Sequence, residues 1–165
     1  MVELYLIRHA VAEERGDAWP DDAQRPLTDV GRTRMRKVAQ GLARVGIGLD
    51  VILTSPLVRA RQTADIVAAA FKHPPAIVAF DALSPETPHA DIVAGLRRYG
   101  RKKRVALVGH EPDLGQLAGR LLGMKTPVPF KKGAVCRIDV SKLPPTAPGT
   151  LQWFATPAML RAMRK

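Results

Sequence analysis

The sequence contains almost none of the features that cross-link a protein, anchor it in a membrane or export it. Its 165 residues include one cysteine, Cys136, which therefore has no disulfide partner within the chain. Because a Cys-x-x-Cys pair is also absent, a thiolate zinc site is excluded. The longest apolar run, 66–71, has six residues, whereas a membrane-spanning helix needs about 20. The first residues also lack the basic and then apolar order of a signal peptide. We therefore expect a cytoplasmic protein with Cys136 in its core and no membrane partner.

Acidic and aromatic residues are also scarce. The 15 Asp and Glu residues against 26 Lys and Arg residues give a net charge of +11, which favours anionic partners such as phosphate groups, acidic proteins, nucleic acids or anionic membrane surfaces. Aromatic residues make up 5% of the chain, which disfavours a stacking platform for single-stranded nucleic acid. The remaining composition is typical of a folded protein. We expect one domain, 1–165, without an internal repeat or linker.

Apolar segments with the composition of strands alternate with amphipathic segments of helical period. The pattern predicts strands at 2–7, 51–55, 76–80, 104–109, 133–140 and 150–155. It predicts helices after Thr28, after Pro56, around 92–99 and from Pro112, with a short closing helix from Pro157. Such alternation is typical of an α/β fold, because right-handed crossovers place helices on both faces of a parallel sheet. We expect a three-layer sandwich with a mainly parallel central sheet and two antiparallel strands at one edge.

Polar segments follow the first four predicted strands, at the end where such folds bind ligands. The segments are 8–9, 55–59, 81–87 and 109–111. Taken singly, each residue has an ordinary structural explanation. His9 would bond a backbone carbonyl, His110 would cap the following helix, and Arg8 and Arg59 would form surface ion pairs. Together they match phosphate, because guanidinium groups bind its oxygens in pairs and imidazoles can donate, accept or attack. The sequence therefore predicts a cationic pocket suited to phosphoryl transfer.

Three segments carry a resemblance to a known family. They are Leu6-Ile7-Arg8-His9-Ala10, the segment 55–63 with its Arg-Ala-Arg-Gln-Thr run, and Val108-Gly109-His110-Glu111-Pro112. In order and spacing they resemble the histidine phosphatase superfamily, which has the phosphoglycerate-mutase-like fold. The segments 25–28, 83–85, 130–134 and 153–160 are most similar to the short SixA-type phosphohistidine phosphatases. The resemblance spans essentially the whole chain. It implies that His9 attacks phosphorus, that Arg8, Arg59 and His110 hold the phosphoryl oxygens, and that water hydrolyses the phosphohistidine.

A proton donor for the leaving group is less well defined. Many superfamily members place a carboxylate in the loop after the third strand, which makes Glu86 the candidate general acid. However, the Leu83-Ser84-Pro85 form before it is that of the short branch, in which this acid is not always present. Glu86 would otherwise be a solvated loop residue. Glu13, Glu14 and Asp17 in the long loop after the first strand are the alternative donors.

The resemblance also implies a class of substrate. A phosphohistidine needs less acid catalysis than a phosphate ester, because its imidazole leaving group can be protonated, and the chain has no insertion long enough for a lid. No metal-ligand spacing such as His-Glu-x-x-His is present. We therefore expect a phosphatase without metal or cofactor that acts on a phosphohistidine-bearing phosphorelay protein. A small-molecule phosphomonoester phosphatase of the same superfamily and a non-catalytic module that binds phosphate or nucleic acid remain the alternatives.

A basic run at 97–104 holds six Lys and Arg residues in eight positions. It precedes the fourth strand, so it should lie at the sheet edge opposite His110. It is either a solvated helix end, where cations are favourable, or a docking patch for an acidic protein or nucleic acid.

Overall fold

A computed structural model describes residues 1–165 and contains one six-stranded sheet of order β3-β2-β4-β1-β5-β6. The strands are β1 (Val2–Arg8), β2 (Val51–Thr54), β3 (Ala76–Ala79), β4 (Arg104–Gly109), β5 (Val135–Val140) and β6 (Thr150–Ala155). Strands β3, β2, β4 and β1 are parallel, whereas β5 is antiparallel to both β1 and β6. This confirms the expected mainly parallel sheet with two antiparallel strands at one edge.

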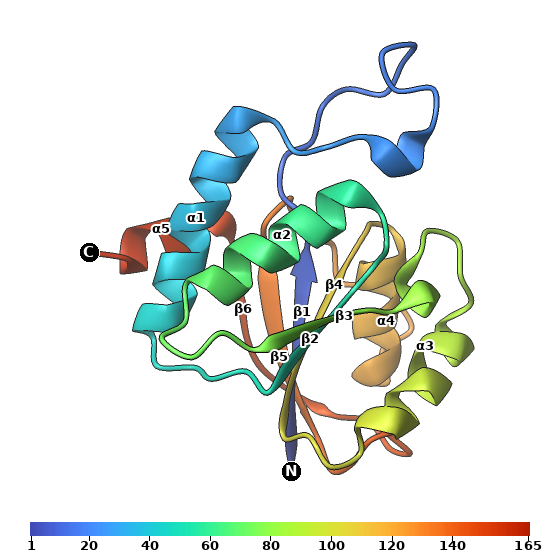
Figure 1. Ribbon diagram of the computed structural model, residues 1–165. Coiled ribbons are helices and arrows are strands. Elements are labelled where there is room, and N and C mark those ends of the chain that lie inside the picture. Colours follow the sequence, from blue (N-terminus) through green and yellow to red (C-terminus); the bar gives the residue numbers. More distant parts are fainter.

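Helices cover both faces of the sheet (Figure 1). One face carries α1 (Asp29–Arg44), α2 (Val58–Ala69) and α5 (Pro157–Met163), and the other carries α3 (His89–Gly95) and α4 (Asp113–Leu121). Short 3-10 helices occur at η1 (Asp22–Gln24), η2 (Asp81–Leu83) and η3 (Leu96–Tyr99). No helix has both the length and the apolarity that crossing a membrane requires.

The two faces of the sheet form two separate hydrophobic cores. Along β1, Leu4 and Leu6 pack in one core with α3 and α4, while Tyr5 and Ile7 pack in the other with α1, α2 and α5. This alternation follows from the two-residue period of a strand. Cys136 is fully buried in the first core, as expected, and its burial raises its thiol pKa to about 12. The expected three-layer sandwich is therefore confirmed.

Helix α1 begins where the sequence predicts. The Thr28 hydroxyl accepts a hydrogen bond from the Gly31 N–H at 2.8 Å, which satisfies one of the free donors of the first turn. Near its other end, α1 approaches α5 so closely that a Cβ at Gly41 would overlap the carbonyl oxygen of Leu160. Glycine at this position therefore lets the short closing helix pack against α1.

Three predicted strands end one residue away from the observed position, and two other boundaries differ by more. Strand β5 begins at Val135 rather than at Gly133, because Gly133 has a φ of +83° and forms a turn instead of extended chain. The helical face predicted to reach Tyr99 divides after Gly95, where α3 tightens into the 3-10 helix η3. The ring of Phe80 packs against the Gly95 backbone, in the space that a Cβ would occupy.

Candidate active site

The structure brings four of the predicted residues to one cavity. Arg8 ends β1, and His110 directly follows β4, the parallel neighbour of β1. The His9 N–H donates to the Gly109 carbonyl oxygen at 3.0 Å, which holds the two strand ends in register. Arg59 lies in the first turn of α2, which follows β2. All four side chains line a cavity of about 320 Å³ at the carboxyl ends of the parallel strands.

His9 is held with one ring nitrogen bonded and the other free. Its side chain is in the protein interior, since the residue is 6% exposed, and Nδ1 lies 2.7 Å from the carbonyl oxygen of Ala10. A carbonyl can only accept, so Nδ1 carries the proton and Nε2 has the lone pair. Burial, assisted by the charges of His110, Arg59 and Arg8, lowers the pKa of His9 to about 3.

His110 faces His9 across the cavity. The two ring centroids are 5.1 Å apart and the ring planes are inclined by 55°. The Nε2 of His110 lies 2.8 Å from the hydroxyl of Ser55, which accepts from the Leu57 N–H at 3.3 Å and can donate its own proton to Nε2. Burial and the charge of Arg59 lower the pKa of His110 to about 3. With the Ser55 hydroxyl donating to Nε2, the neutral ring carries its proton on Nδ1, which is buried and has no hydrogen-bond partner.

The two arginines each use one edge of the guanidinium group for the protein. Arg8 donates from Nη1 to the Phe130 carbonyl oxygen at 2.7 Å, and Arg59 donates from Nη1 to the Asp22 carbonyl oxygen at 2.9 Å. Burial lowers the pKa of both groups. Their Nε atoms are buried and unpartnered, and together with the His110 Nδ1 they are the three buried side-chain polar atoms without a partner. Buried donors are normally paired, so this set is suited to phosphate oxygens.

Two residues of the long loop that were not predicted as site residues support the cavity: Arg25 lines it, and Asp22 binds Arg59. Arg25 lines the cavity and donates from Nη1 to the Glu13 carbonyl oxygen at 2.7 Å. Asp22 accepts from Arg25 Nε at 2.8 Å and from Arg59 Nη2 at 3.1 Å. The hydrogen bond from Arg25 holds the pKa of Asp22 below its usual range. The sequence did contain a signal that could have identified Arg25 as a site residue, because the Arg-Pro-Leu-Thr segment 25–28 contributed to the family resemblance.

The proposed acid Glu86 is not among the residues that line the cavity, although its neighbour Pro85 is. The Glu86 side chain is exposed, its backbone has a φ of +65°, and its N–H donates to Asp113 Oδ2 at 2.8 Å. Of the alternative donors, Glu13 and Glu14 line the cavity and Asp17 does not.

A third carboxylate of the cavity, Glu111, has a different set of contacts. It accepts from the Gly115 N–H at 2.6 Å and from the Phe130 N–H at 3.3 Å. Because the Phe130 carbonyl accepts from Arg8, Glu111 helps to hold that arginine in place.

No group of three or more His, Cys, Asp or Glu side chains in the protein could hold a metal ion.

Comparison with known proteins agrees with this geometry. Residues 4–82 match the sequence model described as "Histidine phosphatase superfamily (branch 1)". An uncharacterized protein of Picosynechococcus sp. is 45% identical over 119 residues, 71% of each chain. Phosphohistidine phosphatase SixA of Escherichia coli is 26% identical over 165 residues, 97% of each chain. A solved structure of the protein histidine phosphatase SixA complexed with tungstate has a TM-score of 0.84 at 24% identity, over 95% of this chain and 98% of that one. This chain therefore belongs to the histidine phosphatase superfamily and has the phosphoglycerate-mutase-like fold of SixA.

Proposed function

We propose that this protein removes the phosphoryl group from a phosphohistidine of a phosphorelay protein, through a covalent phosphohistidine on His9. The observation that carries the proposal is the state of His9. Its Nδ1 proton is bound to the Ala10 carbonyl, so Nε2 keeps a lone pair in a cavity where Arg8, Arg59 and His110 have unpartnered buried nitrogens. A nucleophile beside preorganised donors is what phosphoryl transfer requires.

The reaction has two displacements. In the first, His9 Nε2 forms a bond to phosphorus while the bond between phosphorus and the substrate imidazole breaks, and that imidazole leaves with a proton. In the second, water attacks phosphorus, the bond to His9 breaks, and inorganic phosphate carries away the oxygen of the water. Arg8, Arg59 and His110 hold the non-bridging oxygens in both steps. The proton comes from a carboxylate near the cavity: Glu13 and Glu14 line it, whereas the loop of Glu86 reaches it only at Pro85.

Two features support a protein substrate and a phosphate-binding site. The E. coli relative, which this chain matches over 97% of its length, is a phosphohistidine phosphatase. The SixA structure with the same fold is a complex with tungstate, a tetrahedral oxyanion like phosphate. Tungstate is therefore a suitable stand-in for the transferred group in binding experiments on this protein.

Trapping the covalent intermediate tests the mechanism. The protein is mixed with phosphorus-labelled phosphoramidate, quenched in acid or in base, and the retained label is counted. A phosphohistidine is stable in base and labile in acid, so we expect label only after the base quench. His9→Gln should retain none, whereas the matched control His73→Gln, an exposed imidazole outside the cavity, should retain all of it. Full hydrolysis by His9→Gln would show that His9 is not the nucleophile.

A substrate panel tests the specificity separately. Turnover is compared for a phosphohistidine protein, a phosphoserine peptide, a sugar phosphate and an aryl phosphate, each with and without a chelator. We expect the phosphohistidine protein to be preferred and the chelator to have no effect. Preference for a small phosphomonoester would favour the alternative within the superfamily, and loss of activity with the chelator would contradict a mechanism without metal.

A further inference from the structure

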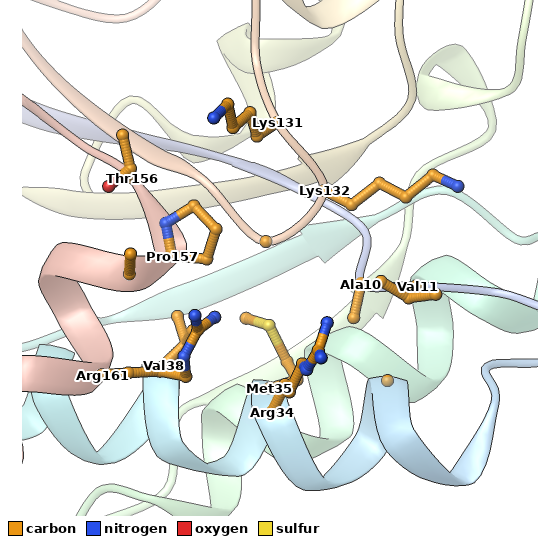
Figure 2. A pocket seen from close by; sticks show the side chains of 13 residues that line it. Ala10, Val11, Arg34, Met35, Val38, Lys131, Lys132, Thr156, Pro157 and Arg161 are labelled. Carbon is orange, nitrogen blue, oxygen red and sulfur yellow. The ribbon is translucent and has the colours of Figure 1, made fainter.

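A second cavity, of about 300 Å³ (Figure 2), shares the lining residue Lys132 with the catalytic cavity. It is enclosed by α1, by the turn at 131–133 before β5, and by the start of α5. Figure 2 shows Arg34 and Arg161 extending from the two helices toward the space below this turn. The 13 lining residues include four cations and no Asp or Glu, and the cations are Arg34, Lys131, Lys132 and Arg161.

None of these four cations is neutralised within the chain. The ion pairs of the protein use other basic residues: Arg15, Arg25, Arg32, Arg59, Arg61, Arg104 and Arg137. Charges of one sign that line a concave wall add up to a positive potential and raise the local concentration of anions. The second cavity is therefore suited to carry negative charge supplied from outside the chain.

The second cavity adjoins the catalytic one. Lys132 lines both, and Ala10, which follows the nucleophile His9, lines the second. The turn is also fixed to the catalytic strand, because the Gly133 N–H donates to the Arg8 carbonyl oxygen and the Arg8 N–H donates to the Ala134 carbonyl oxygen, each at 3.2 Å. The main chain therefore joins the turn that lines the second cavity to the strand end that lines the catalytic one.

The walls of the second cavity also suit the methylene groups of an acidic side chain. The buried side chains of Met35 and Val38 form part of its lining, together with Pro157 and Ala158. Gly133 closes the turn against this apolar surface, since a Cβ there would touch Met35 and Pro157 at 3.6 Å. An apolar lining with a rim of arginine and lysine matches Asp and Glu, which combine a short hydrocarbon stem with a carboxylate.

We propose that this second cavity is a docking site for acidic side chains that flank the phosphohistidine on the protein substrate. The proposal rests on the proposed function and adds a determinant of substrate specificity to it. A small phosphomonoester fills one cavity, whereas a protein that presents its phosphohistidine to His9 reaches the other cavity with a neighbouring segment. Arg34 and Arg161 are the residues to test, because they line the second cavity and not the catalytic one.

Binding of three peptides tests the proposal. The first carries phosphotriazolylalanine, a stable analogue of phosphohistidine, followed by Asp and Glu residues. The second has Asn and Gln in place of those acids, and the third keeps the acids but has plain histidine. Dissociation constants are measured by fluorescence anisotropy for the parent protein and for Arg34→Gln/Arg161→Gln. The control is Arg97→Gln/Arg98→Gln, which removes the same charge from the exposed basic run.

We expect the parent and the control to bind the acidic analogue peptide about tenfold more tightly than the neutral one, as for one or two charge-assisted hydrogen bonds. In Arg34→Gln/Arg161→Gln this preference should disappear, while turnover of phenyl phosphate stays unchanged. Absence of the preference in the parent, or an equal loss in the control, would overturn the docking site. Equal binding of the acidic histidine peptide and the acidic analogue peptide would instead contradict the proposed phosphohistidine substrate, whatever the result for Arg34 and Arg161.

Discussion

Arg59 donates two hydrogen bonds to Asp22, one to the carbonyl oxygen at 2.9 Å and one to the carboxylate at 3.1 Å, from a side chain that is 2% exposed. The long loop after β1 therefore binds the buried guanidinium group of Arg59, which lines the catalytic cavity. The carboxylate of Asp22 also accepts from Arg25, so one acidic residue organises two arginines.

Asp22→Ala should lower the free energy of unfolding by about 1–3 kcal/mol, because the buried guanidinium of Arg59 loses its carboxylate partner. Urea denaturation of the two proteins at neutral pH measures the change. Asp17→Ala is the matched control, since Asp17 is an exposed acid of the same loop without an ion pair. Equal stability of Asp22→Ala and Asp17→Ala would contradict this role of Asp22.

The protein should lose stability as the pH falls below neutral. Burial lowers the pKa of His9 and of His110 from 6.5 to about 3. Above pH 6.5 both folded and unfolded states are neutral at these sites. Between pH 6.5 and 3 only the unfolded chain takes up the protons, which favours unfolding. Between pH 7 and pH 5.5, each of the two histidines should lower the free energy of unfolding by about 1 kcal/mol.

Urea denaturation at these two pH values checks the sign and the size of the effect. His9→Gln should reduce the difference in unfolding free energy between pH 7 and 5.5 by about 1 kcal/mol, because one buried imidazole is removed. The exposed His73→Gln is the control and should leave the difference as in the parent. A parent protein that becomes more stable on acidification would show that the sign is wrong.

Ser55→Ala should lower kcat by about tenfold, with little change in KM, as expected when one hydrogen bond that orients a site residue is lost. The Ser55 hydroxyl lies 2.8 Å from His110 Nε2 and is the side chain that holds the ring. Steady-state turnover of phenyl phosphate measures the effect. Thr54→Val removes the neighbouring hydroxyl, which donates only to the Ser55 carbonyl oxygen, and should keep kcat close to that of the parent. The same kcat in both variants would argue against an orienting role for Ser55.

Gly41→Ala should destabilise the protein by about 1–3 kcal/mol, although alanine is the better helix former by about 1 kcal/mol. The added Cβ would overlap the Leu160 carbonyl oxygen and push α5 away from α1. Gln40→Ala, at an exposed position of the same helix, should have little effect. Thermal unfolding compares the two. Because α5 carries Arg161, Gly41→Ala should also weaken the preference for the acidic peptide. A Gly41→Ala variant more stable than the parent would contradict the close contact between α1 and α5.

The fold could be predicted because its determinants are local. The two-residue period of Leu4, Tyr5, Leu6 and Ile7 directs alternate side chains to two cores, and Thr28 marks the start of a helix by bonding a backbone N–H three residues along the chain. The boundaries were less accurate where a tertiary contact decided them. Phe80 packs at Gly95, where the helix changes its form, and no periodicity in the sequence records that contact.

The site could be predicted in part for the same reason. Arg8, His9 and His110 follow directly after neighbouring parallel strands, and parallel strands end at the same edge of a sheet. Arg59 follows from the turn into the next helix. Glu86 could not be placed in this way, because the conformation of a loop decides whether its side chain faces the cavity or the solvent.

The sequence alone therefore determined the layers of the fold and the cluster of residues around His9, since strand period, helix capping and the geometry of parallel strands connect them directly to the order of the residues. Only the tertiary structure decided which distant segments meet. It brings Asp22 and Arg25 over the strand ends, and it joins Arg34 of α1 to Arg161 of α5 around one cavity. These contacts depend on how loops and helices pack over long distances in the chain, and packing of this kind leaves no repeating pattern in the sequence.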